Sequence, residues 1–318
     1  MKIKRYDSSM QPLWDDFVKA SKNGTFLHMR AYMDYHSDRF HDYSLMFYGD
    51  SDRLVAVLPA NADGDQLWSH QGLTYGGLLL SPHARATEVG RMFKSLVEFM
   101  SDNGFRNLHL KDVPHIYHRQ PSDESEYWLW RYGASMESCL ISTTVPLHPK
   151  QPIVIERRRN RGVKKAHEAG LSIEYNVSID VMWPIVENNL RERYDVSPVH
   201  TLDEIKLLQS RFPEQILCHV VRNSEGAVVA GVVLYECNEC VVHAQYGHAT
   251  PEGKQLGALD LLYMTIIEDY RSRGTFDFFD YGNSNERAGH YLNDNLILQK
   301  EGFGGRGVTY KTYSLTVR

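Results

Sequence analysis

Two helical segments with the same apolar spacing lie 170 residues apart in this chain of 318 residues. Between Arg85 and Gly104, apolar residues recur at the i, i+3, i+4, i+7 spacing of a helix with one buried face. The same spacing recurs in a second segment that ends at Gly274. A glycine directly after a helix favours its C-terminal end. Two amphipathic helices could match by chance, so the flanking segments decide whether the chain contains a repeat.

The segments around both helices also match. LVAVL at Leu54–Leu58 precedes the first helix, and VVAGV at Val228–Val232 precedes the second. Each helix is followed by another strand-like segment, at 105–111 and 275–281. A strand–helix–strand crossover of this length places its two strands parallel to one another. The predicted fold class is therefore α/β or α+β, with two tandem domains that each contain a mixed sheet flanked by helices.

A linker with prolines separates the two halves. HPKQP, at His148–Pro152, has two prolines in five residues. The next segment, IERRRNRGVKKAHEAGL, reads as a basic helix that is broken at Gly162 and ends at Gly170. We expect an N-terminal domain at residues 1–150 and a C-terminal domain at residues 151–318. The basic residues are candidates for phosphate contacts, although a run of charge is more often a solvated face.

Composition restricts the classes of function. The formal charge of −5 gives no general attraction to nucleic acid or to an anionic membrane. No segment approaches the ~18 apolar residues that a membrane-spanning helix needs. Four cysteines do not make a disulfide framework, and the histidines lack HExxH spacing, so no metal site is expected. We expect a soluble, cytoplasmic protein without a membrane span; its oligomeric state stays open.

Several segments resemble the FemAB-like branch of the GNAT acyltransferase superfamily. They are the double unit, the RRRNRGVKKAHEAGL helix, and FDYGNSNE followed by LILQKEGFGG. Trp14, Phe17 and Asn23–His28 are similar to the start of the first domain in that branch. The resemblance covers nearly the whole chain and is poorly specific for substrate. It implies transfer of an acyl or aminoacyl group to an amine, from acyl-CoA or from a charged tRNA.

The resemblance implies a donor site at EGKQLGALD, Glu252–Asp260. The candidates for binding acyl-CoA are Gly253, Lys254, Gly257 and Ala258, because amides at a helix N-terminus beside a lysine can bind an anion. The segment departs from the usual Arg/Gln-x-x-Gly-x-Gly/Ala pattern. The alternative is that its glycines only shape a turn and a close helix–sheet contact. The first repeat has no glycine here, so only the second domain is expected to hold a phosphorylated donor.

A cluster of short polar residues follows the predicted strand that ends near Asp280. Open α/β sheets bind ligands beyond the carboxyl ends of their strands. Asp280 or Glu286 is a candidate to accept the proton of the amine. The candidates for holding the acceptor are Asn283, Ser284 and Asn285. The alternative is ordinary turn chemistry, with Glu286 paired to a surface cation.

A second candidate base is His243, in HAQYGHA at 243–249, because an imidazole titrates near pH ~6.5. Strand alternation predicts His243, Gln245 and Gly247 on one face, and Tyr246, a candidate for substrate binding, on the other. A structural histidine is the alternative. The resemblance also implies that Lys300, in QKEGFGG, contacts a phosphate or the transition-state oxyanion. The alternative there is a solvated lysine.

The first domain offers a candidate acceptor site. SHQGLTYGG, at Ser69–Gly77, is rich in small and polar residues for a strand end. Tyr75 from this segment joins Tyr35 and His36 as a candidate for substrate binding, and a plain glycine-rich turn is the alternative.

The leading hypothesis is an N-acyltransferase that moves an acyl group from acyl-CoA to the amine of a small molecule or amino sugar. From the resemblance alone, the acceptor could be nucleotide- or lipid-linked and belong to cell-envelope polysaccharide synthesis. The alternatives are an aminoacyl transferase that uses charged tRNA, and a non-catalytic binding protein with the tandem fold.

Overall fold

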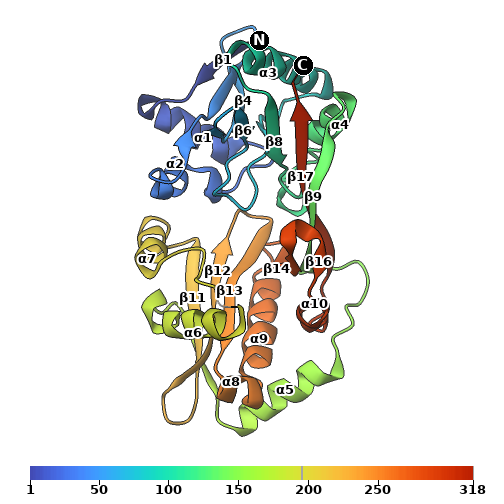
Figure 1. Cartoon of the computed structure of the whole chain (residues 1–318). Helices are drawn as coiled ribbons and strands as arrows, with labels where there is room; N and C mark the ends of the chain where they lie inside the picture. The colour runs from blue at the N-terminus through green and yellow to red at the C-terminus, as the bar shows by residue number, and fades with distance from the viewer. Residues whose placement is uncertain (195, 318) are drawn as a thin grey trace. The chain divides into compact units, whose positions relative to one another are not determined.

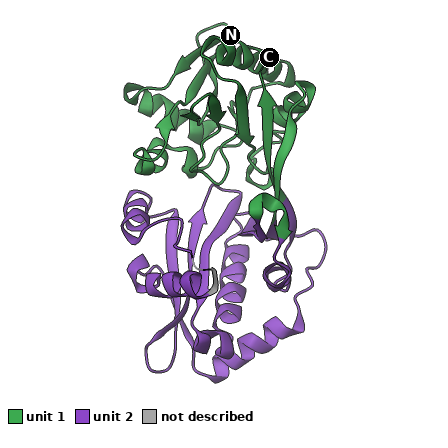
Figure 2. Cartoon of the chain, in the orientation of Figure 1, with its two compact units in different colours: residues 1–141, 287–291, 309–318 green, residues 142–286, 292–308 purple. Residues whose placement is uncertain are grey.

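A computed structural model describes residues 1–194 and 196–317. They divide into two compact units, coloured separately in Figure 2. Unit 1 contains residues 1–141, 287–291 and 309 onward, and unit 2 contains residues 142–286 and 292–308. The units thus change at residue 142 rather than near residue 150, and two later segments return to unit 1.

Unit 1 is built from two sheets with helices packed against them (Figure 1). One sheet has the strand order β1-β3-β4-β7, and the strands β2-β5-β6-β8 form part of the other. The long strands β9 (Ser135–Pro146) and β17 (Arg306–Thr316) contribute residues to both units. The other elements of unit 1 are β1 (Lys2–Arg5), α1 (Gln11–Ala20), α2 (Arg30–Met33), β2 (His41–Asp42), β3 (Leu45–Tyr48), β4 (Leu54–Leu58), β5 (Asn61–Asp63), β6 (Gln66–Trp68), β7 (Leu79–Leu80), α3 (Ala86–Asp102), β8 (Asn107–Lys111) and α4 (Glu124–Arg131).

Unit 2 contains a mixed sheet in the order β10-β11-β12-β13-β14-β9. Its strands are antiparallel except for the parallel pair β13 and β14. Its elements are α5 (Arg157–Glu168), β10 (Ser172–Glu174), α6 (Trp183–Tyr194), α7 (Leu202–Arg211), β11 (Ile216–Arg222), β12 (Val228–Glu236), β13 (Val241–Ala249), α8 (Pro251–Leu256), α9 (Ala258–Arg273), β14 (Phe278–Asn283) and α10 (Asp294–Glu301), and the small strands β15 (Asn285–Glu286) and β16 (Tyr291–Leu292) lie between β14 and α10.

The two predicted amphipathic helices are α3 and α9. Each buries its apolar face against the sheet of its own unit: Phe93 and Leu96 of α3 are in the core of unit 1, and Leu262 and Ile266 of α9 are in the core of unit 2. In both units the helix connects two parallel strands, β6 to β8 and β13 to β14. The predicted fold class, mixed sheets flanked by helices, is confirmed.

The basic helix α5 differs from its prediction, because Gly162 does not break it. The helix runs through Gly162 without interruption. A Cβ at this position would overlap the carboxylate of Asp260 on α9, so the glycine permits close packing between the two helices. Arg159 of α5 forms an ion pair with the same Asp260.

The parallel strands β13 and β14 separate after a short ladder. Their pairing covers only three positions and ends at His243 and Asp280. Directly beyond this pair, β13 has a bulge at Gln245 against β12, and β14 has a bulge against β9 between Asp280 and Asn283. A bulge bends its strand and leaves a residue unpaired. The two bulges therefore produce an opening between the strands, which we call the β13–β14 opening.

The bulge also corrects the predicted faces of β13. Tyr246 pairs with Val233, and His243 pairs with Tyr235 two positions along the same face of β12. Tyr246 therefore lies on the same face as His243, while Ala244 lies on the other face, in the core with α9. Simple alternation failed because Gln245 is an extra residue in the strand.

None of the helices within residues 1–194 and 196–317 is long and apolar enough to cross a membrane.

Candidate active site

His243 and Asp280 form a hydrogen-bonded pair at the base of the β13–β14 opening. The Nδ1 atom of His243 lies 2.8 Å from Oδ2 of Asp280. A carboxylate can only accept hydrogen bonds, so Nδ1 carries the proton and Nε2 of the neutral ring is free of one. The side chain of His243 is 12% exposed and that of Asp280 is fully buried. This geometry makes His243, rather than Asp280, the group that can accept a proton from a ligand.

Two hydroxyl groups of β9 support Asp280. Ser142 and Thr144 both donate to Oδ1 of Asp280, Thr144 at 2.8 Å. Hydrogen bonds from three donors stabilise the ionised form of a carboxyl group. Neither hydroxyl was predicted from the sequence, because β9 lies about 140 residues before β14 and nothing local indicates that the two strands are neighbours.

A glycine gives the ring of His243 its room. Gly282 on β14 has a φ of +75°, a conformation that favours glycine. A Cβ there would lie 3.1 Å from Cε1 of His243. Gly282 thus permits both the turn of β14 and the position of the imidazole above it.

Lys300 of α10 fastens the end of β14. Its Nζ donates to the carbonyl oxygens of Gly282 at 2.8 Å and Asn283 at 2.7 Å. Burial lowers the pKa of Lys300 to about 8, partly offset by the attraction of Asp280. The lysine lies close to the His243–Asp280 pair and is not a solvated side chain.

The polar residues after β14 differ in their surroundings. Asn283 is exposed, while Ser284 is buried and its hydroxyl has no partner among the described residues. Asn285 is half-buried. Glu286 is exposed and accepts a 3.4 Å hydrogen bond from the side chain of Asn293. Asn283, Ser284 and Asn285 stay candidates for acceptor binding, and Glu286 lies on a separate small strand, β15.

Tyr246 belongs to a second polar group on the His243 face. Its hydroxyl lies 2.8 Å from Nδ1 of His200, and its ring packs edge-on against Trp183 of α6. Both His200 and Tyr246 are buried. Tyr246 therefore has protein partners already, and its role in substrate binding stays a prediction.

The predicted donor residues are held by the protein itself. The amide of Gly253 donates to the hydroxyl of Thr250, and a Cβ on Gly253 would overlap the backbone of β12. The amine of Lys254 donates to Asn189 at 2.9 Å. Gly257 has a φ of +77° and lies against the backbone of Gly162 in α5.

Ala258, at the start of α9, is fully buried. The first turn of α9 also carries Asp260, whose pKa is raised by burial and lowered by its ion pair with Arg159, with the raising effect larger. Helix α5 thus covers the N-terminus of α9. The glycines serve close packing, which was the alternative interpretation of this segment.

The predicted acceptor residues of unit 1 lie in a buried aromatic group. Tyr75 is 2% exposed and its hydroxyl is within 3.4 Å of Thr25. His36 is 1% exposed, stacks on His70, and contacts the half-buried Tyr35. These side chains fill the interior of unit 1, so a ligand would reach Tyr75 and His36 only after a rearrangement.

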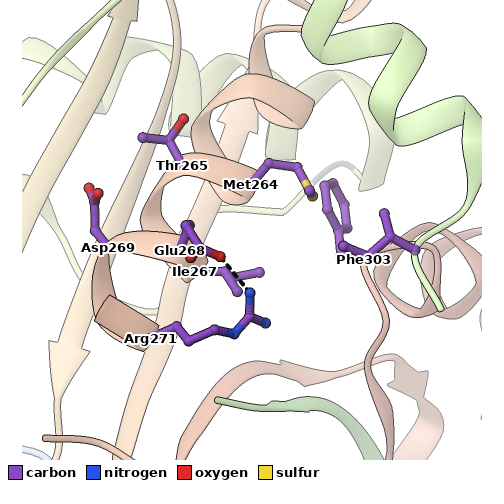
Figure 3. A pocket seen from close by; sticks show the side chains of 8 residues that line it. Met264, Thr265, Ile267, Glu268, Asp269, Arg271 and Phe303 are labelled. Carbon is purple, nitrogen blue, oxygen red and sulfur yellow. Dashed lines mark hydrogen bonds and ion pairs between the residues drawn. The ribbon is translucent and has the colours of Figure 1, made fainter. Parts of the chain in front are cut away.

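A shallow groove of about 400 Å³ lies along α9 (Figure 3). Met264, Ile267 and Phe303 supply apolar lining, and an ion pair between Glu268 and Arg271 lies beside them. His243 points to the opposite face of the sheet from α9, so this groove is not part of the His243–Asp280 site. Within residues 1–194 and 196–317, no group of three or more metal-ligating side chains is positioned to hold a metal ion.

Comparison with known proteins identifies the type of domain. Residues 156–291 match the family model of the acetyltransferase (GNAT) domain. This match contains β13, β14, α9 and the His243–Asp280 pair. The chain is a GNAT-type acyltransferase. No curated protein matches its sequence.

Solved structures extend the likeness to the whole chain. FemX is 11% identical, with a TM-score of 0.69 over 99% of this chain and 97% of its own. L-PGS from Bacillus licheniformis is 10% identical, with a TM-score of 0.62 over 96% of this chain and 91% of its own. A tandem GNAT protein from the clavulanic acid biosynthesis pathway is 13% identical, with a TM-score of 0.52 over 100% and 98%. At these identities the likeness shows the fold, which is FemAB-like.

Proposed function

We propose that this GNAT-type acyltransferase moves an acyl group from an activated carboxyl donor to a primary amine at the β13–β14 opening. The observation that carries the proposal is the His243–Asp280 pair, which places an unprotonated Nε2 atom at the partly exposed base of the opening. The match of residues 156–291 to the GNAT domain supports acyl transfer as the reaction.

The reaction uses His243 as general base. Nε2 takes a proton from the attacking amine, whose nitrogen then bonds to the carbonyl carbon of the donor. The tetrahedral intermediate collapses with cleavage of the carbon–sulfur bond of a thioester or the carbon–oxygen bond of an ester. The leaving thiol or hydroxyl recovers the proton from the imidazolium, so that amine and donor give an amide and the free carrier. Asp280 keeps the ring oriented and stabilises its charge.

Lys300 positions the oxygen-rich end of β14. By binding the carbonyl groups of Gly282 and Asn283, its ammonium group fixes the strand at the point where β14 leaves β13. A positive charge next to the opening also favours the negative oxygen that develops on the donor carbonyl.

Acyl-CoA is the first donor candidate, because GNAT domains use acyl-CoA. The acceptor candidate is a small molecule or amino sugar, either free or linked to a nucleotide or lipid, as in the building of envelope polysaccharides. The candidates for contacting it are Asn283, Ser284 and Asn285, which come after the opening along the chain.

Aminoacyl-tRNA is the second donor candidate, and a specific observation favours it. The N-terminus of α9, where a CoA pyrophosphate would be expected, is covered by α5 and carries Asp260 in its first turn. A pyrophosphate at this place would meet a carboxylate and the backbone of Gly162. The fold shared with FemX and L-PGS agrees with either donor.

One experiment separates the donors. Purified protein is mixed with a panel of amines and amino sugars, and with either radiolabelled acetyl-CoA or radiolabelled aminoacyl-tRNA, at low and at moderate salt. Formation of amide from acetyl-CoA supports the first donor, and formation from aminoacyl-tRNA with a steep loss at moderate salt supports the second. Calorimetric binding without amide formation from either donor would instead support the non-catalytic alternative.

A further inference from the structure

Aromatic side chains close one face of the β13–β14 opening. On the side of α9, the ring of Tyr263 lies with its centroid 4.8 Å from that of Tyr281 on β14. Phe303, which comes after α10, lies 5.5 Å from Tyr263 and 5.5 Å from Tyr281. All three side chains are almost fully buried. The opening therefore has a floor of three rings on this face.

Tyr263 reaches across both strands. A Cβ on Gly247 of β13 would overlap the hydroxyl of Tyr263, so the phenol tip lies directly against β13. The same ring packs edge-on against Tyr281 of β14. Gly247 is thus the residue that admits Tyr263, and Tyr263 is the side chain that bridges the two strands where their ladder is absent.

The opposite face of the opening holds the reactive pair. His243 and Asp280 lie on the face away from α9, since their neighbours Ala244 and Phe279 belong to the core that contains α9. His243 and Gly282 are partly exposed there. A donor carbonyl attacked beside His243 must therefore enter from this face, with its acyl chain directed through the opening toward α9.

We propose that Tyr263 limits the length of the acyl group, so that the site takes short acyl groups and excludes longer ones. This inference rests on the proposed function, since it assigns the far end of the acyl chain to the floor of the same opening. The ring of Tyr263 is held between Gly247, Tyr281 and Phe303 and has no room to swing away. Packed interiors resist such a displacement because they contain few voids.

The test is a donor series of straight acyl chains from two to eight carbons, offered as thioesters, with wild type, Tyr263→Ala and Tyr263→Phe. For wild type we expect kcat/KM to fall by about tenfold or more for each step beyond the limit, as methylene discrimination in tight sites does. Tyr263→Ala should move the limit to chains longer by several carbons. Tyr263→Phe keeps the ring and loses only the hydroxyl, so it should keep the wild-type profile.

A second measurement guards against a misfolded variant and against failure of the proposed function. Calorimetric binding of unreactive amides of the same chain lengths asks only what the opening admits, and thermal unfolding checks that each variant is folded. If wild type binds the short amides but transfers no acyl group, the proposed function is overturned and the length limit stands. If folded Tyr263→Ala shows the wild-type limit in both assays, or wild type accepts eight carbons as well as two, the inference is overturned.

Discussion

Unit 1 and unit 2 repeat the same local topology, and only unit 2 has an opening. In both, a hairpin leads through a helix to a strand parallel to the second strand of the hairpin. The last registered parallel pair is Trp68 with His109 in unit 1 and His243 with Asp280 in unit 2. These pairs occupy the same place in the two units, and the segment directly after each pair decides which unit can react.

In unit 1 the chain seals the place of the opening. The amide of Ser69 donates to the carbonyl of His109, and the amide of Gly76 donates to that of Lys111. Residues 69–78 therefore fold over the end of β8 before β7 begins. In unit 2 the same place has only a one-residue bulge, at Gln245. An inserted segment satisfies the strand edges in one unit, and their separation leaves room for a ligand in the other.

The chemistry of the two pairs differs as well. The imidazole of His109 stacks on Trp68 and has partners at both nitrogens, Glu137 at 2.6 Å and Gln66 at 3.0 Å. It offers no unprotonated nitrogen to a ligand. Catalysis in a duplicated fold is thus restricted to the copy that keeps both an opening and a free imidazole nitrogen.

The largest contrast is expected from substitutions at the second member of each pair. Asp280→Asn cannot accept from the histidine and the hydroxyls together, so kcat/KM should fall about 10²- to 10⁴-fold. His109→Phe, the matched change in unit 1, should change kcat/KM less than about twofold. Steady-state kinetics on both variants, with thermal unfolding to confirm the fold, makes the measurement. Equal losses in the two variants would break the comparison.

The next effect should be shared by the units, because each contains a buried neutral histidine. The Nδ1 atoms of His28 and His219 accept backbone amides, and burial lowers the pKa of each imidazole to about 4. The unfolded chain binds protons from about pH 6.5 downward, so stability is present above pH 6.5 and is lost as pH falls toward 4. The loss should reach about 3 kcal/mol per histidine.

Chemical unfolding at pH 7 and pH 4.5 measures this effect against single variants. His28→Asn and His219→Asn keep a side-chain acceptor and remove the titration, so each should reduce the acid loss. A variant whose stability falls with pH as steeply as wild type would show that the histidine is not responsible.

The smallest effect should come from two lysines with similar contacts. Lys111 donates to the carbonyls of Gln71 and Leu73, as Lys300 does to those of Gly282 and Asn283. Replacing either with methionine leaves two carbonyls unpaired and should cost about 1–3 kcal/mol of stability. Only Lys300→Met should also lower kcat/KM, because only unit 2 has the opening.

The pH dependence of the lysine variants sharpens this result. Burial lowers the pKa of both lysines to about 8, below the 10.5 of an exposed lysine. The unfolded chain holds more protons between these values, so stability should rise as pH increases from 8 to 10.5. Each methionine variant should show a smaller rise than wild type. An unchanged rise would mean that the lysines are not buried as described.

The sequence predicted the helices and the parallel strands because their signals are local. The apolar stripes of α3 and α9 specify a buried face, and the strand segments flank them in the same order. His243 and Asp280 were both predicted as separate candidates. Their pairing could not be predicted, since register depends on the bulge at Gln245 and on hydroxyls that β9 contributes from far along the chain.

Other features of the site depend on packing that no pattern reveals. Gly257 and Gly162 read as an anion loop and a helix break, and in the structure both permit α5 and α9 to approach. Tyr263 reads as one apolar position in a helical stripe. Its contact with Gly247 depends on where β13 bends, which is set by the whole sheet.

The central claim is that His243 accepts the proton of the amine. Its most direct test is the pH dependence of kcat/KM for acyl transfer by wild type and by His243→Ala. We predict that the variant loses at least about 10²-fold at neutral pH and that its rate rises steadily with pH, because free amine must then form without a protein base. A folded His243→Ala with wild-type rate and pH profile would contradict the account.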